Sequence, residues 1–331
     1  MKIIAVIVTY NRLKLLKKCL QAVQAQTRKP DEIMVINNGS TDRTLDWVLT
    51  QHVTTYTQEN NGGAGGFSHG INMAYRHGAD WIWLMDDDTI PQADALEHLE
   101  SALNKLAAQQ DKVGFLSSTV LWTDGSVHKI NRTWPLTDRN QIQNFSIDTT
   151  NDLSFIKWGT FVSMLLSAKA VERVGLPIKD FFIWCDDAEY SKRIINNGLA
   201  GLAVNESVVL HETPVNHENS VFTDPQSAIW KYKYGLRNEL YTRRLHDSEL
   251  VFWASWIHRM FVLPFRIMVK RRNHRLSFMK VVWQSTWNAT FFHPAIAKAD
   301  GRGADNNIQP TINIGDVRKP AERQDAQVLS K

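Results

Sequence analysis

Short apolar runs alternate with amphipathic stretches through the first 120 residues, and this alternation limits the possible folds more than any other feature. The apolar runs predict strands at Ile3–Val8, Glu32–Ile36, Val53–Thr57, Trp81–Met85 and Val113–Ser117. The stretches between them predict helices at 14–24, 43–49, 67–77 and 93–107. Strands that alternate with helices are typical of an α/β fold, in which a mostly parallel sheet is covered by helices.

The pattern is less regular after residue 155. Residues 155–166 and 201–210 are predicted strands, and 190–197 is a predicted helix. From Asp224 onward the chain is predicted to be helical, with an interruption at Pro264.

These patterns divide the chain into three parts. Residues 1–222 form the predicted α/β domain, and residues 223–295 form a helical extension. Residues 296–331 are polar and rich in Gly, Asp, Asn and Gln, so we expect a poorly ordered tail there.

Polar or glycine-rich residues directly follow four of the predicted strands. These clusters are Thr9–Arg12, Asn37–Asp42, Asn60–Gly66 and Asp86–Thr89. Ligands of parallel α/β sheets bind beyond the carboxyl ends of the strands. We therefore expect the four clusters to meet at one rim of the sheet and to form a ligand site.

Asp86, Asp87 and Asp88 form the most informative cluster, because the apolar run before them would be buried. In an extended chain Asp86 and Asp88 would share a face. Two carboxylates this close repel each other unless a cation lies beside them, and Mg²⁺ or Mn²⁺ suits such oxygen ligands together with phosphate. The alternative is a solvated acidic turn before the helix that follows Pro91.

The glycine-rich segment Asn60–Gly66 has neither the G-x-G-x-x-G spacing of dinucleotide-binding folds nor a Walker motif. Its glycines, including Gly63, Gly65 and Gly66, would let the backbone approach a ligand closely ahead of a helix N-terminus. This favours a sugar or a phosphate as ligand. A flexible turn is the alternative.

A second acidic pair, Asp186 and Asp187, follows the aromatic stretch 181–184. Apolar surroundings raise the pKa of a carboxyl group, which suits a general base. The pair also precedes a predicted helix, so N-capping is the alternative role. Both roles are compatible if one Asp caps the helix and the other faces the cleft.

His211 is the best candidate ligand among the eleven histidines, because the apolar run before it would deliver it to an edge of the sheet. The His211-Glu212 pair lacks the second His of a zincin helix, so a zinc protease is not expected. A structural role for His211 is the alternative.

Taken in order, the segments 8–12, 37–42, 86–88 and 186–187 resemble those of the family 2 glycosyltransferases, which have the GT-A fold. Within that family, segments 62–67, 83–88 and 184–190 are most similar to bacterial galactofuranosyltransferases and next to rhamnosyltransferases. The resemblance covers roughly residues 1–245. It implies an inverting transfer from a nucleotide sugar to an acceptor hydroxyl.

The resemblance also implies roles for single residues. The donor nucleotide sugar would be bound by Thr9, Tyr10, Arg12, Asn38, Gly63, Gly65, Gly66, Asp86 and Asp87. Mg²⁺ or Mn²⁺ would be bound by Asp86, Asp88 and His211, and Asp187 would be the base, with Asp186 as the second choice. Many family members have Asp where Asn38 stands, so UDP-sugars and dTDP-sugars both remain open as donors.

Two separated acidic clusters suit this reaction physically. An in-line displacement needs one base on the acceptor side and charge neutralisation on the leaving diphosphate. A retaining hydrolase would instead need two carboxylates that face one bond, without a metal, and fits less well.

The helical extension is basic and aromatic. Residues 231–280 carry twelve Lys or Arg against three acidic residues, while the whole chain has a net charge of +4. Apolar residues recur there at helical spacing and precede a basic run: Leu250, Trp253, Trp256, Ile257, Met260 and Phe261, then Arg266, Lys270, Arg271, Arg272 and Arg275. Charged residues and Pro264 interrupt the stretch 251–269, so we expect no transmembrane helix.

Such a helix suits the interface of an anionic membrane. The alternative is that the apolar stripe packs on the α/β domain or on a second subunit, as in a homo-oligomer. No nucleic-acid recognition motif accompanies the basic residues, so a nucleic-acid partner is not expected.

The sequence therefore predicts a glycosyltransferase that associates with the inner face of the cytoplasmic membrane. Two cysteines suit a reducing compartment, and the first apolar run is too short for a signal peptide. The expected reaction moves galactofuranose from UDP-galactofuranose to a lipid-linked bacterial glycan. The alternatives are a rhamnosyltransferase that uses dTDP-rhamnose and a non-catalytic scaffold that binds a nucleotide sugar.

Overall fold

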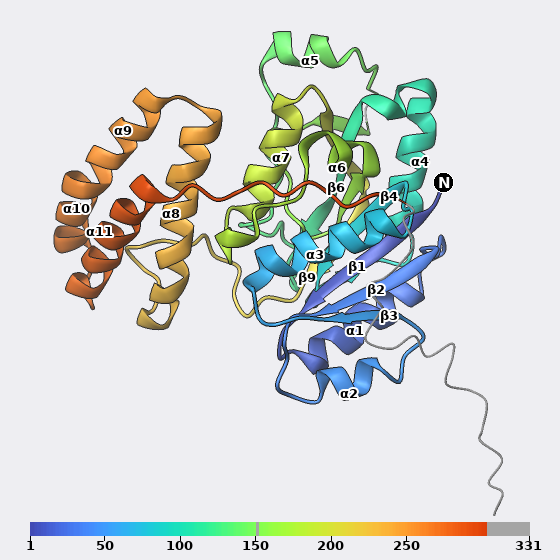
Figure 1. Cartoon of the computed structure of the whole chain (residues 1–331), viewed down its shortest axis with the longest axis horizontal. Coiled ribbons are helices and arrows are strands. Elements are labelled where there is room, and N and C mark those ends of the chain that lie inside the picture. The colour runs from blue at the N-terminus through green and yellow to red at the C-terminus, as the bar shows by residue number, and fades with distance from the viewer. Residues whose placement is uncertain (150–151, 303–331) are drawn as a thin grey trace, which may run out of the picture.

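The computed structural model describes residues 1–149 and 152–302 (Figure 1). A mixed β-sheet forms the centre of the α/β domain. Its strands are β1 (Ile3–Thr9), β2 (Glu32–Asn37), β3 (Thr54–Thr57), β4 (Trp81–Asp86), β5 (Thr89–Pro91), β6 (Val113–Leu121), β7 (Leu153–Phe155), β8 (Met164–Ser167) and β9 (Ala200–His211). The spatial order is β3-β2-β1-β4-β8-β6-β9-β5, and β7 pairs with β9.

The first half of the sheet is parallel, as the sequence predicted. In the β1–β2 and β1–β4 ladders, Thr9 is opposite Asn37 and Val8 is opposite Asp86. This register brings the carboxyl ends of three strands to one rim. The second half is mixed, because β8 runs antiparallel to both β4 and β6.

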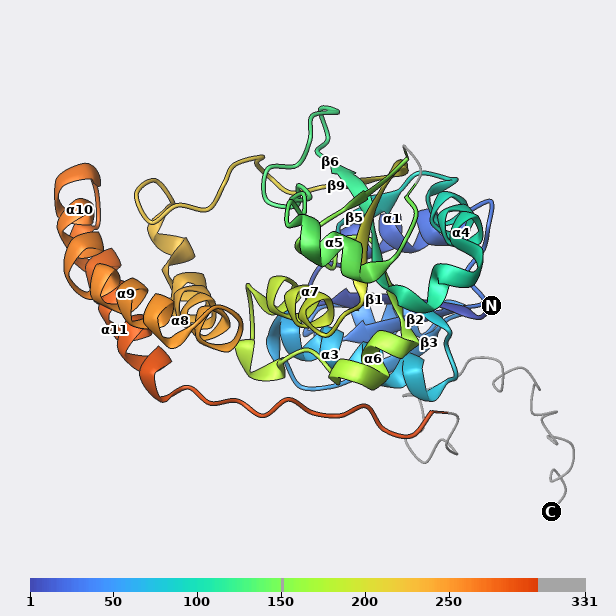
Figure 2. The same ribbon diagram turned by 90° about the horizontal axis from the view of Figure 1, so that it is seen from above.

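Helices cover both faces of the sheet and build the C-terminal part of the chain. They are α1 (Leu13–Gln24), α2 (Thr44–Val48), α3 (Gly62–Arg76), α4 (Ala95–Leu106), α5 (Arg139–Phe145), α6 (Ala168–Val174), α7 (Asp186–Asn196), α8 (Ile229–His246), α9 (Glu249–Ile257), α10 (Leu263–Lys270) and α11 (Arg275–Phe291). Figure 2 shows α3 and α6 on one face of the sheet and α1 and α4 on the other. A π-helical segment, His258–Val262, joins α9 to α10.

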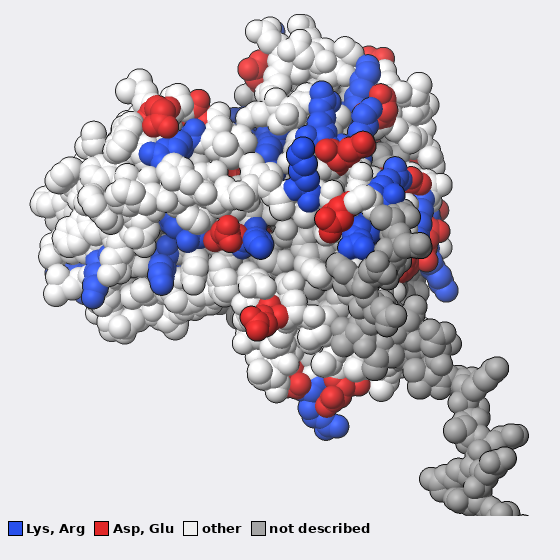
Figure 3. Space-filling model, in the orientation of Figure 1, with Lys and Arg blue, Asp and Glu red and all other residues white. Residues whose placement is uncertain are grey.

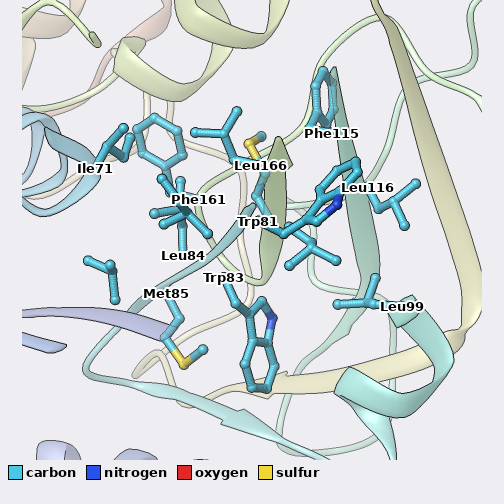
Figure 4. Close-up of a cluster of buried hydrophobic side chains, with 14 of the residues drawn as sticks. Ile71, Trp81, Trp83, Leu84, Met85, Leu99, Phe115, Leu116, Phe161 and Leu166 are labelled. Carbon is cyan, nitrogen blue, oxygen red and sulfur yellow. The ribbon is translucent and has the colours of Figure 1, made fainter. Parts of the chain in front are cut away.

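The core explains the continuous apolar runs of the sequence. A strand that is covered on both faces is apolar along its whole length, and β4 is buried from Trp81 to Met85. Figure 4 shows Trp83, Leu84 and Met85 of this strand among side chains from β6 and β8. The indole Nε1 of Trp83 donates to Ser163 Oγ at 2.9 Å, so its polar atom is satisfied.

The predicted strand 155–166 is wrong as a single element. The chain instead forms β7 and β8, and the loop 156–163 separates them. Residues 158 and 160–162 of this loop line the main cavity of the protein. The apolar residues of this loop therefore line a cavity and do not form a strand.

Helices α8–α11 form a separate unit, which we call the helical unit (Figure 1). It has its own core, which includes Tyr232, Leu236, Ile267, Phe278 and Val282. Within the described ranges, no helix combines the length and the apolar character needed to cross a bilayer.

Residues 292–302 return from α11 to the α/β domain without regular secondary structure (Figure 2). Leu176 N donates to Ala297 O at 2.8 Å, and Asn72 Nδ2 donates to Asp300 Oδ2 at 2.8 Å. The predicted disordered tail began at residue 296, but 296–302 are held by these bonds. The rest of that predicted tail, 303–331, lies outside the described residues.

Candidate active site

A cavity of about 1620 Å³ lies at the carboxyl ends of β1, β2 and β4 and extends to the helical unit. Its walls include residues from each predicted cluster: Thr9, Tyr10, Arg12, Asn38, Gly62, Gly63, Asp86, Asp87, Asp88, Asp186, Asp187 and His211. Pockets for small ligands are about 300–1,000 Å³ in volume. This cavity is therefore large enough for two substrates.

Asp86, Asp88 and His211 meet on one wall of the cavity. One ligand atom from each lies within 4.8 Å of the others. The contact depends on the short strand β5, in which Thr89 pairs with His211 on β9. This pairing places His211 Nε2 at 3.0 Å from Asp88 Oδ1. Sequence analysis proposed the three residues as ligands but did not predict β5.

Two residues from the loop between β6 and α5 fix the ring of His211, and sequence analysis missed both. Asn131 Oδ1 lies 2.9 Å from His211 Nδ1, so this nitrogen donates and Nε2 faces the carboxylates. The His128 ring packs on His211 with centroids 4.7 Å apart. Burial, followed by the neighbouring His211, lowers the pKa of His128 to about 4.

The three Asp carboxyl groups are unequal in acidity. Burial alone would raise the pKa of Asp88, but hydrogen bonds and charges from His211 and Arg12 outweigh it and lower that pKa. Burial and then the charge of Asp88 raise the pKa of Asp87 to about 6. Burial, with Asp88 and Asp87 next, raises the pKa of Asp86 well above its usual range.

This donor set fits a divalent cation. Carboxylate oxygens and one imidazole nitrogen suit Mg²⁺ or Mn²⁺. Burial and the charges of Asp88 and Asp87 raise the pKa of Asp86 despite the charge of Arg12, and a nearby divalent cation would favour its charged form.

Thr9 and Arg12 hold the acidic cluster in place. Thr9 Oγ1 donates to Asp87 Oδ2 at 2.7 Å. Arg12 Nη1 donates to Asp88 Oδ2 at 2.5 Å and lies 3.5 Å from Asp87 Oδ1. Tyr10 stands at the cavity rim with 43% of its surface exposed. Tyr10 is therefore free to contact a ligand, while Thr9 is committed to Asp87.

Asn38 lines the cavity, but its amide is fully used by the protein. Its Nδ2 donates to Gly62 O at 2.7 Å and to Asn60 Oδ1 at 3.3 Å. Its Oδ1 accepts from Gln58 Nε2 at 2.8 Å and from Asn61 N at 3.3 Å. A side-chain amide has two donor hydrogens and one acceptor oxygen with two lone pairs. Asn38 thus shapes the cavity by holding residues 58–62.

The predicted glycine loop is the first turn of α3, which begins at Gly62 and not at residue 67. Gly63 lines the cavity, and a Cβ there would meet no atom within 4 Å. Gly66 packs on Val8 of β1, and Gly65 packs on Asn61. Gly65 and Gly66 are not among the residues that line the cavity, and their missing side chains make room for protein atoms, so their ligand contact stays a prediction.

Asp186 and Asp187 form the first turn of α7 and also line the cavity. Burial raises the pKa of Asp187 to about 6, and burial together with the charge of Asp187 raises the pKa of Asp186 to about 8. Ala188 N donates to Asp187 Oδ1 at 2.7 Å. Among the residues that the structure describes, no cationic side chain is within ion-pair distance of either carboxylate.

The loop before this pair has an unusual backbone. Phe182, Trp184 and Cys185 have φ values of 65°, 67° and 70°. Residues other than glycine rarely adopt this left-handed backbone conformation. Asn238 of α8 holds the loop, because its Nδ2 lies 2.9 Å from Phe181 O, 3.1 Å from Ile183 O and 2.9 Å from Trp184 O.

Two glycines leave room for the same loop. A Cβ on Gly62 would collide with the carbonyl oxygen of Phe182, and a Cβ on Gly235 would collide with the indole of Trp184. The loop 181–185 is therefore packed closely between α3 and α8. Sequence analysis found the two Asp residues but not this support.

Lys231 of α8 adds a cation to the cavity wall. Its Nζ lies 5.9 Å from the ring of Trp184 and 5.8 Å from that of Trp230. Burial, and then the charge of Arg12, lower the pKa of Lys231. Sequence analysis counted it only as part of a basic region. In the structure Lys231 lines the same cavity as Arg12.

Comparison with known proteins agrees with this site. The family model described as "Glycosyl transferase family 2" matches residues 4–165. Galactofuranosyltransferase GlfT1 of Mycolicibacterium smegmatis is 32% identical over 205 residues, which are 59% of this chain and 66% of that protein. Galactofuranosyltransferase GlfT1 of Mycobacterium tuberculosis is 31% identical over 219 residues, which are 63% of this chain and 69% of that protein. The match thus spans about two thirds of these relatives.

Solved structures share the fold. GalNAc-T7 with UDP, GalNAc and Mn²⁺ superposes with a TM-score of 0.58 at 14% identity, covering 87% of this chain and 56% of that one. S. aureus TarS 1–349 in complex with UDP-GlcNAc gives a TM-score of 0.54 at 13% identity, covering 87% and 81%. These likenesses show the GT-A fold. The sequence matches show that the chain belongs to glycosyltransferase family 2.

Proposed function

We propose that this protein is a metal-dependent, inverting glycosyltransferase that moves galactofuranose from UDP-galactofuranose to a hydroxyl of a lipid-linked bacterial glycan. The observation that carries the proposal is the presence of two unlike acidic clusters in one cavity, one at the end of β4 and one in the first turn of α7. The galactofuranosyltransferase relatives support the choice of sugar.

The donor diphosphate would bind at the wall of Asp86, Asp88 and His211, which would hold Mg²⁺ or Mn²⁺. A bound divalent cation neutralises charge that develops on a leaving diphosphate. Arg12 and Lys231 supply further positive charge at this end of the cavity. Tyr10, Asp87 and Gly63 would contact the nucleotide sugar, while Thr9 and Asn38 would act by holding Asp87 and residues 58–62.

The acceptor would be activated by Asp187. Its carboxylate takes the proton of the acceptor hydroxyl while the oxygen bonds to the anomeric carbon and the bond from that carbon to the diphosphate breaks. Asp187 is the better base because its side chain is the more exposed of the two. Burial raises the pKa of both carboxyl groups, so the pair as a unit can exchange a proton near neutral pH.

The experiment that tests this function measures nucleotide release by the full chain. The donors are UDP-galactofuranose, UDP-galactopyranose, UDP-glucose and dTDP-rhamnose, each with Mn²⁺ and with EDTA, together with a lipid-linked acceptor extract. We expect metal-dependent release from UDP-galactofuranose. Release from dTDP-rhamnose alone would make the protein a rhamnosyltransferase, and nucleotide binding without any release would support the scaffold.

We also propose that the helical unit binds the inner face of the cytoplasmic membrane. Its described surface exposes large apolar side chains at helical spacing, among them Leu250, Ile257, Phe261, Phe265, Val269, Leu276, Trp283, Trp287 and Phe291. Figure 3 shows that this unit is mostly uncharged in that view, with a few Lys or Arg and some Asp or Glu at its upper end. Exposed Arg266, Lys270, Arg272 and Arg275 complete the pattern of an interfacial surface.

Charge reversal tests this membrane proposal. We expect the triple variant Arg266→Glu, Lys270→Glu, Arg272→Glu to lose co-sedimentation with vesicles of phosphatidylglycerol. Arg271 must stay, because it is buried and its Nη1 donates to Val221 O at 2.6 Å. Reversal of the exposed residues Lys14, Lys29 and Arg43 is the control. Unchanged sedimentation of the triple variant, with a dimer in light scattering, would assign the surface to a second subunit.

A further inference from the structure

Two tryptophans form an aromatic step at the edge of the cavity. The ring centroids of Trp134 and Trp158 are 5.5 Å apart and the planes are tilted by 36°. Trp158 lines the cavity, whereas Trp134 lies beyond its wall and is 39% exposed. The guanidinium of Arg132 lies 4.3 Å from the centroid of the Trp134 ring.

Backbone hydrogen bonds join the two segments that carry these rings. Lys157 N donates to Trp134 O at 2.8 Å, and Leu136 N donates to Phe155 O at 2.9 Å. On the surface, Arg132 Nη2 lies 3.1 Å from Glu218 Oε1. Segments joined in this way lose less backbone entropy when a ligand stacks on the rings than separate loops would.

The aromatic step begins beside the proposed base. Trp158 is followed by Gly159, whose N–H donates to Ser191 Oγ at 3.2 Å. Ser191 Oγ donates in turn to Asp187 O at 2.8 Å. The segment of Trp158 is thus linked to Asp187 through Ser191, and Trp158 lines the cavity whereas Trp134 does not. An acceptor that presents a hydroxyl to Asp187 would extend toward Trp158.

We propose that Trp158 and Trp134 bind the sugar residues of the acceptor, with Arg132 as a hydrogen-bond donor to their hydroxyl groups. The apolar C–H face of a sugar ring stacks on an indole, and its hydroxyl groups find polar partners at the ring edge. Exposed Arg132 and Lys157 on either side favour a carbohydrate over a lipid chain. The inference rests on the proposed function, since an acceptor has meaning only for a transferase.

Removal of the outer ring tests the inference. Trp134 is partly exposed, so we expect Trp134→Ala to fold and to raise the KM for octyl β-D-galactofuranoside about three- to tenfold. The KM for UDP-galactofuranose and its slow hydrolysis without acceptor should not change. Trp134→Phe should restore most of the acceptor KM. Val127→Ala, at an exposed position of the same loop, is the matched control.

A binding measurement separates this inference from the proposed reaction. Saturation-transfer NMR with octyl β-D-galactofuranoside and octyl α-L-rhamnopyranoside, in the presence of UDP, detects contact without turnover. If Trp134→Ala abolishes these NMR signals, acceptor binding at the aromatic step is supported even if no donor is turned over. An unchanged acceptor KM and unchanged NMR signals in Trp134→Ala would overturn it, and a loss of vesicle binding in that variant would assign the loop to the membrane.

Discussion

Asp88 in the first acidic cluster and the Asp186–Asp187 pair in the second have the same side chain and unlike surroundings. Asp88 in the first cluster contacts Arg12 and His211. Asp186 and Asp187 in the second face the aromatic loop and, in the described part of the chain, have no cationic partner within ion-pair distance. Cationic neighbours favour a fixed negative charge, whereas burial without them favours a group that exchanges protons near neutral pH. The comparison shows that residue type alone does not assign a role.

Loss of Asp88 should have the largest effect. Asp88→Ala removes a predicted metal ligand and leaves Arg12 and His211 without their shared carboxylate. Metal catalysis and charge pairing each contribute several kcal/mol, so we expect turnover to fall roughly 10⁴-fold. Isothermal titration should show that Mn²⁺ no longer strengthens UDP binding. Equal UDP binding with Mn²⁺ and with EDTA in the native protein would contradict the metal role.

Asp187→Asn should be the next most severe change. The amide preserves the shape of the side chain but accepts no proton, so we expect kcat to fall roughly 10³-fold. The KM for the donor should stay close to its native value, because the first cluster is untouched. Steady-state kinetics give both numbers. Asp186→Asn is the matched control. A larger loss of kcat in Asp186→Asn than in Asp187→Asn would assign the role of base to Asp186.

Asn131→Ala should weaken the metal site without removing a ligand. The variant frees His211 Nδ1 from its 2.9 Å contact, so the ring loses its fixed tautomer and orientation. Losses of this kind cost about 10- to 100-fold in metal affinity. Electron paramagnetic resonance of Mn²⁺ with UDP measures that affinity directly. Unchanged affinity would show that His211 needs no such support, and Asn216→Ala, in the same region but outside the cluster, is the control.

The pH dependence should show the smallest change. The pKa of Asp187 is raised to about 6, so below that pH the base is protonated and inactive. We expect kcat to fall about tenfold for each pH unit below about 6 and to level off above it. Asp187→Asn should remove this limb from the profile. A native profile that stays flat down to pH 5 would assign the proton transfer to another group.

The rim of the sheet could be predicted from the sequence because it follows from local pattern and parallel pairing. Apolar runs mark β1, β2 and β4, and parallel register places Thr9, Asn37 and Asp86 at one edge. The stripe through Leu250, Ile257 and Phe261 was equally visible from its spacing. Its exposure was not, because periodicity defines a face of a helix but not what covers that face.

Other parts of the site depend on contacts that no local pattern reveals. Asn131 lies 80 residues from His211, and Asn238 lies 57 residues from Phe181. Glycine disfavours helices, so the start of α3 at Gly62 contradicts propensity, and contact with β1 through Gly66 favours it. Tertiary packing decided each of these cases.

The return of the chain after α11 constrains how the helical unit can move. A body attached at a single point can rotate about any axis through that point, but a second attachment leaves only rotation about the line between the two. Here the helical unit has more than two attachments, because Asn238 of α8 holds the loop 181–184 in addition to the segment that enters α8 and to residues 292–302, which are hydrogen-bonded at Leu176 and Asn72. A single proteolytic cut within 293–296 would therefore remove one attachment and leave the contacts of α8 in place.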